Sequence, residues 1–133
     1  MEVREGMSSV VLAVGPGHTL RDTAIKMTEK GTGAALVFDE ESPAPRIITE
    51  RDILNAIGSG QDPDSEKVAD HMSESVISAA PDWSLEQAAE EMVQRGIRHL
   101  VVVQRGELVG VLSMRDIVRC WTQIGATSSM SPP

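Results

Sequence analysis

The residues of this sequence with the clearest capacity to bind a ligand occur twice, in the segments IITERDIL and VLSMRDIV. Each segment has two apolar residues, then Thr49 or Ser113, and three positions later Asp52 or Asp116. This spacing is typical of a helix start, where the hydroxyl accepts a backbone N–H and the carboxylate lies near the positive end of the helix dipole. The same helix start offers free N–H groups to a phosphate, and a carboxylate one turn in can accept hydrogen bonds from both hydroxyls of a ribose. Two interpretations therefore stay open, a helix cap and a nucleotide site.

Positively charged residues accompany both aspartates. Arg51 and Arg115 directly precede them, and the segment GIRHL adds Arg98 and His99 in the second half, where the first half has glycine and alanine. Arginine presents several fixed N–H donors, which suits it to phosphate. We therefore consider these four residues a candidate phosphate-binding group. The alternative is that they are solvated residues at helix ends and strand edges.

The sequence segments that must position these residues are also duplicated. With a shift of 65, ten of the 36 positions from Val3 to Phe38 are identical in the second half, whereas ordinary residue frequencies give about two or three by chance. A shift of 64 then aligns the two segments described above. Each half predicts the same order of elements, a short extended run, an amphipathic helix, two strands and a second helix.

The boundaries of these elements follow from apolar patterning and turn residues. The expected strands are Val10–Val14, Ala35–Phe38 and Ile47–Thr49 in the first half and Val76–Ala79, Leu100–Val103 and Leu108–Ser113 in the second. Ser84 and Gln87 have the spacing of a capping box, and Gly31 and Gly96 stand where the first helix of each half would end. One β-α-β-β-α unit has too few layers to cover both faces of its sheet. We therefore expect an α/β (α+β) fold in which two such units pack with pseudo-twofold symmetry.

Length and composition limit the class of protein. A chain of 133 residues is expected to form a first unit at 1–58, a linker at 59–66, a second unit at 67–124 and a disordered tail at 125–133. The net charge of −8 argues against sequence-independent binding to nucleic acid, which needs a basic surface. A single cysteine, the absence of a signal peptide and the absence of a long apolar run predict a cytoplasmic protein that does not span the membrane.

With these segments in this order, the sequence resembles the cystathionine-β-synthase (CBS) domain pair, also called the Bateman module, and is similar to its small, free-standing bacterial type. The resemblance implies that AMP, ADP, ATP, S-adenosylmethionine or a related adenosyl ligand binds in clefts between the units, as a regulatory ligand and not as a cofactor. It assigns Asp52 and Asp116 to the ribose and places Thr49 and Ser113 near the phosphate. It further implies a sensing role in signalling, for example of energy state, a homodimer, no catalytic activity, and a regulated protein that the sequence does not identify.

Two features of the sequence bear on this implied function. The family often has a glycine just before the third strand; Gly110 keeps it, but Arg46 replaces it in the first half, so we expect the second site to be the better ligand site. The second hypothesis is a protein–protein interaction module with empty or vestigial clefts, and a third is an uncharacterised enzyme. Histidines and the single cysteine lack the spacing of metal ligands, so no metal is expected.

Overall fold

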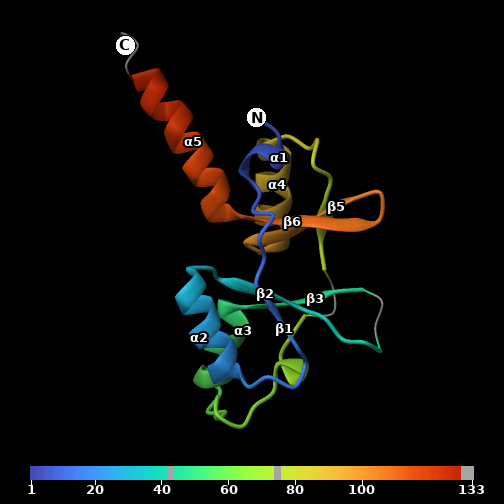
Figure 1. Ribbon diagram of the computed structural model, residues 1–133. Coiled ribbons are helices and arrows are strands. Elements are labelled where there is room, and N and C mark those ends of the chain that lie inside the picture. The colour runs from blue at the N-terminus through green and yellow to red at the C-terminus, as the bar shows by residue number, and fades with distance from the viewer. Residues whose placement is uncertain (42–43, 74–75, 130–133) are drawn as a thin grey trace. The chain divides into compact units, whose positions relative to one another are not determined.

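The computed structural model describes residues 1–41, 44–73 and 76–129 (Figure 1). Its contacts divide the chain into two compact units. The central unit is Val11–Val76, and the terminal unit joins Met1–Val10 to Ile77–Pro133. Each unit combines a three-stranded sheet with helices, so the predicted α+β fold of two β-α-β-β-α units is confirmed.

The central unit contains one small mixed sheet. Its elements are β1 (Ala13–Val14), α2 (Leu20–Lys30), β2 (Ala34–Val37), β3 (Arg46–Thr49), α3 (Glu50–Gly58) and the 3-10 turn η1 (Val68–Asp70). The sheet order is β1-β2-β3, with β1 parallel and β3 antiparallel to β2. The predicted extended run at 10–14 is therefore a strand for two residues only.

The terminal unit repeats this topology. Its elements are α1 (Val3–Gly6), β4 (Ser78–Ala79), α4 (Leu85–Arg95), β5 (His99–Gln104), β6 (Glu107–Ser113) and α5 (Met114–Ser129). The sheet order is β4-β5-β6, with β4 parallel and β6 antiparallel to β5. Helix α5 continues through residue 129, into the segment expected to be a tail, and residues 130–133 lie outside the described residues.

Local sequence signals start and stop the helices as predicted. The Ser84 hydroxyl accepts the N–H of Gln87 at 3.0 Å and begins α4, which is one of the two hydrogen bonds of the predicted capping box. Gly31 and Gly96 end α2 and α4 with φ of 71° and 66°, the left-handed conformation in which a side chain would be strained. Gly31 and Gly96 are therefore required by backbone geometry.

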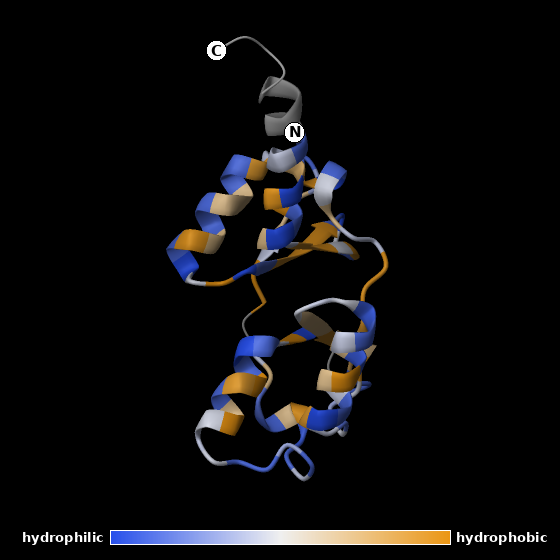
Figure 2. Cartoon of the chain, turned by 90° about the vertical axis from the view of Figure 1, so that its left-hand side faces the viewer, coloured by the Kyte–Doolittle hydropathy of each residue, from blue (hydrophilic) through white to orange (hydrophobic). Residues whose placement is uncertain are grey.

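Each unit has its own apolar core between its sheet and its helices. Figure 2 shows apolar residues along the strands and alternating polar and apolar bands on the helices. Leu20, Ile48 and Val68 belong to the core of the central unit, and Leu85 and Leu100 to the core of the terminal unit. Branched aliphatic side chains thus fill cores that contain almost no aromatic residue.

The first residues of each repeat pack into the compact unit that contains most of the other repeat. Val3, from the start of the first repeat, is fully buried in the terminal unit, where its N–H donates to the Trp83 carbonyl at 2.8 Å. Val68, the equivalent residue of the second repeat, is fully buried in the central unit, and its N–H donates to the His18 carbonyl at 2.9 Å. The predicted limits 1–58 and 67–124 describe repeats along the sequence and stay a prediction. Each compact unit differs from the repeat that forms most of it, because it includes the first residues of the other repeat.

Candidate functional site

The first candidate site is the start of α3 in the central unit. Thr49 is the N-cap, and its hydroxyl accepts the Asp52 N–H at 3.4 Å. The Asp52 carboxylate reaches back and accepts the Thr49 N–H at 2.8 Å and the Thr49 hydroxyl at 3.1 Å, all through Oδ2. The two residues therefore form a reciprocal capping box, in which each side chain satisfies a backbone donor of the other.

This arrangement leaves part of the Asp52 carboxylate available. Oδ1 of Asp52 has no hydrogen-bond or ion-pair partner among the described residues, and no buried side-chain polar atom in that part of the chain lacks a partner. Oδ1 is therefore open to solvent. A half-buried carboxylate, fixed by a cap and open on one side, has the properties needed to accept hydroxyl donors from a ligand.

The second candidate site is the start of α5 in the terminal unit. The Ser113 hydroxyl accepts the Asp116 N–H at 3.0 Å, and Asp116 Oδ2 accepts the Ser113 N–H at 2.8 Å. This pair repeats the capping box of the central unit. The helix-cap interpretation is therefore confirmed at both places, and it does not exclude a ligand, because the cap uses one carboxylate oxygen.

The two sites differ in the residue three positions after each aspartate. Arg119 Nη2 donates to Asp116 Oδ1 at 2.9 Å, while the equivalent position in α3 is the exposed Asn55. Arg119 was not among the predicted site residues. The signal that could have revealed it is the separation of three positions on a helix, at which opposite charges meet.

In the terminal unit, β5 and the residue before it bring two of the predicted cations beside the cap. His99 is the cross-strand partner of Ser113, and the Arg98 carbonyl accepts the Met114 N–H at 2.8 Å. In the central unit, alanine at position 34 takes the place of His99 opposite Thr49. His99 is half-buried and Arg98 is exposed. The sheet register thus places both residues at the predicted site of the terminal unit.

The remaining predicted cations, Arg51 and Arg115, occupy the first turns of α3 and α5 and are exposed. Both are engaged in interactions with other parts of the protein. Their chain positions place them next to the candidate sites, and their role toward a phosphate stays a prediction.

The glycine that distinguishes the two halves has a steric reason. A Cβ on Gly110 would lie 2.7 Å from the backbone oxygen of Ser8, which pairs with Val111 on the same strand. Arg46 occupies the equivalent position and pairs with Val37. Gly110 is therefore needed so that the N-terminal segment can lie against β6.

Other ionisable groups offer fewer possibilities. Within residues 1–41, 44–73 and 76–129, no group of three or more His, Cys, Asp or Glu side chains is arranged to hold a metal ion. The His71 Nε2 lies 2.8 Å from a Glu66 carboxylate oxygen. Over the same described residues, no helix is both long and apolar enough to cross a bilayer.

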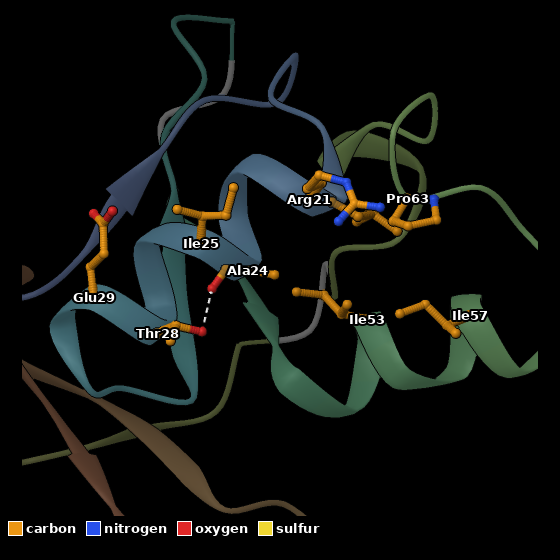
Figure 3. A pocket seen from close by; sticks show the side chains of 9 residues that line it. Arg21, Ala24, Ile25, Thr28, Glu29, Ile53, Ile57 and Pro63 are labelled. Atoms are coloured by element: carbon orange, nitrogen blue, oxygen red, sulfur yellow. Dashed lines mark hydrogen bonds between the residues drawn. The ribbon is translucent and has the colours of Figure 1, made fainter.

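A groove on the central unit is lined mainly by apolar side chains and has a volume of about 300 Å³. Figure 3 shows it between α2 and α3, with Ile25, Ile53 and Ile57 lining it. Arg21 at its rim forms an ion pair with Asp64, and their hydrogen bond lowers the pKa of the Asp64 carboxyl. Such a surface is suited to contact with another apolar surface.

The fold and these two helix starts define a tandem pair of CBS units. The CBS domain family model matches residues 2–59 and 68–122, so the chain belongs to the CBS domain family. The predicted family is thereby confirmed.

Three known proteins illustrate the relationship. Uncharacterized protein MK0525 of Methanopyrus kandleri is 34% identical over 119 residues, which are 88% of this chain and 61% of that protein. The hexameric CBS-CP12 protein from bloom-forming cyanobacteria has 27% identity and a TM-score of 0.82, over 90% of this chain and 71% of that chain. The CBS domain protein PAE2072 from Pyrobaculum aerophilum, complexed with AMP, has 32% identity and a TM-score of 0.76, over 87% of this chain and 89% of that chain.

Proposed function

We propose that this chain is a regulatory sensor that binds an adenine nucleotide or a related adenosyl ligand at the starts of α3 and α5. The observation that carries the proposal is the duplicated capping box, in which an aspartate is fixed beside a helix N-terminus in each unit. The N-terminus offers N–H groups to a phosphate, and the carboxylate offers acceptors to a ribose. The AMP complex of PAE2072, at 32% identity, supports this ligand class.

The proposal includes no catalysis. The family model that matches this chain is the CBS domain, and the aspartate of each capping box has a structural role, in which its Oδ2 caps its own helix. We propose instead that ligand binding changes the affinity for a regulated protein or a second copy, which requires that the ligand binds two states of the chain with different affinity.

A thermal-shift panel with AMP, ADP, ATP, S-adenosylmethionine and NADH tests the ligand class. A ligand that binds only the folded chain, at 100 times its Kd, adds about 2.7 kcal/mol to the free energy of unfolding, so the midpoint rises measurably. If none of the five compounds raises it, the alternative of an interaction module with empty clefts is favoured. Formation of a product from any compound would instead indicate an enzyme.

Calorimetric titration of variants then tests the site. Asp52→Asn and Asp116→Asn together should weaken binding about ten- to a hundredfold, because each removes a charged acceptor while an amide oxygen still caps the helix. Asp22→Asn is the matched control, since Asp22 stands in the same Thr-x-x-Asp spacing and its N–H donates to the Thr19 hydroxyl at 3.1 Å in α2. A double variant that binds as tightly as the unaltered chain would refute the site.

We also propose that the chain forms a homodimer through exposed apolar residues of its helices. Ile57 on α3 and Trp121 on α5, at equivalent positions of the two repeats, are 51% and 40% exposed. Leu54 and Val118, three positions earlier, are also exposed, so each helix presents an apolar stripe. A chain that carries the same stripe twice is suited to an isologous contact with a second copy, and the hexameric CBS-CP12 protein is a relative that assembles.

A further inference from the structure

The carboxylate of Asp116 is occupied on both oxygens. Its Oδ2 accepts the Ser113 N–H at 2.8 Å, and its Oδ1 accepts Arg119 Nη2 at 2.9 Å. The same Nη2 lies 3.5 Å from the carbonyl oxygen of Gly6 in α1. Arg119 is therefore held from two directions, and the Asp116 side chain is only 13% exposed.

The carboxylate of Asp52 is occupied on one oxygen. Asn55 is the equivalent of Arg119 in α3; it is exposed and makes no hydrogen bond to Asp52 among the described residues. The hydrogen bonds of Asp52 to Thr49 all use Oδ2. Two aspartates with the same cap thus differ in whether the other oxygen is covered.

We propose that Arg119 masks Asp116, so that only the Asp52 carboxylate is open to a pair of ligand hydroxyls when no ligand is bound. The consequence of this inference for ligand binding rests on the proposed function. The ligand binds the Asp52 site first, and it binds the Asp116 site only when the hydrogen bond from Arg119 to Oδ1 is broken. The order is the opposite of the one expected from Gly110. The difference arises because a glycine in the strand affects packing, whereas Arg119 competes directly for the acceptor.

Carboxylate labelling tests the masking without any ligand. The folded chain is treated with a water-soluble carbodiimide and glycine ethyl ester, and the label on each aspartate is measured by peptide mass spectrometry. Asp52 should react faster than Asp116. Arg119→Asn should raise the rate at Asp116 about two- to fivefold, the equilibrium factor of an exposed ion pair, and Asn55→Arg should lower the rate at Asp52.

A control variant and the exchange at Asn55 keep this test decisive. Arg4→Asn removes another exposed arginine of the terminal unit, one that pairs with Glu2 at 3.0 Å, and should leave the rate at Asp116 unchanged. Asn55→Arg alters an exposed position, so it remains informative if Arg119→Asn is unstable. Equal labelling of Asp52 and Asp116 in the unaltered chain, or no response to either exchange, would overturn the proposal.

Titration with AMP tests the consequence for binding. In an Asp52→Asn background, which leaves the Asp116 site, Arg119→Asn should tighten AMP binding about two- to fivefold. Weaker binding would overturn the proposal, because it would mean that Arg119 contacts the ligand. If labelling changes as expected but AMP binds no variant and not the unaltered chain, the masking stands and the proposed function fails for AMP.

Discussion

Val3 and Val68 occupy equivalent positions of the two repeats, and the structure predicts that their replacement weakens opposite units. Val3 is fully buried in the core of the terminal unit, and Val68 is fully buried in the core of the central unit. Val3→Ala should therefore destabilise the sheet of the second repeat, and Val68→Ala the sheet of the first. A chain whose repeats folded as continuous segments would show the reverse.

The size of the effect follows from the buried surface. Valine to alanine removes two methyl groups, worth about 0.8 kcal/mol each when fully buried, or roughly 1.6 kcal/mol together. The cavity that remains adds a further cost because the surroundings relax only in part. We expect a loss of about 2–3 kcal/mol in the free energy of unfolding of the affected unit, similar for both variants.

Native-state hydrogen exchange measures this loss strand by strand. In Val3→Ala, protection should fall most in β5 and β6, and in Val68→Ala it should fall most in β2 and β3. Urea unfolding provides a second readout, because both tryptophans, Trp83 and Trp121, belong to the terminal unit. The fluorescence midpoint should therefore fall in Val3→Ala more than in Val68→Ala.

The exchange of segments would be refuted if Val3→Ala reduced protection most in the central unit. Equal losses in both sheets for both variants would contradict the expectation that each unit opens on its own. A loss well below 1 kcal/mol would contradict the burial of these two side chains.

Two further predictions concern close packing and the apolar helix surfaces. Gly110→Ala should lower the free energy of unfolding by about 1–3 kcal/mol, because its Cβ would lie 2.7 Å from a backbone oxygen of the N-terminal segment. Gly33→Ala should cost less, because its Cβ would meet the Glu50 carboxylate, the end of a flexible side chain. Urea unfolding of both variants checks this difference, and equal losses would contradict it. Ile57→Glu should shift the chain from dimer to monomer in analytical ultracentrifugation, since it places a charge in the proposed interface. Gln104→Glu adds the same charge at the exposed end of β5 and should leave the dimer intact. A dimer that persists in both variants would exclude this surface.

Much of the fold could be predicted from the sequence because its signals are local. Gly31 and Gly96 end helices where the chain must turn left-handed, and Ser84 begins one by accepting a free backbone N–H. Apolar runs of short length marked the strands, and the repeat itself indicated two units. The boundaries were less accurate at 10–14 and at 76–79, where only two residues of each segment pair with a neighbouring strand.

The candidate site could be predicted in part for the same reason. The spacing of Thr49 and Asp52 predicts a capping box, whose atoms all lie within one turn, and the structure has that box. The pairing of Arg119 with Asp116 was missed, because a separation of three on a helix permits a contact without requiring it. The openness of Asp52 depends on the absence of such a contact, which no short motif reveals.

The sequence by itself determined the duplication, the order of elements and the caps, since each depends on residues that are neighbours along the chain or on a pattern repeated within it. Only the tertiary structure decided which segment completes which core. Val3 and Val68 are equally apolar, and either core would gain free energy by burying either side chain. Their placement follows from backbone hydrogen bonds between segments that are far apart in the sequence, and composition and spacing carry no information about those pairings.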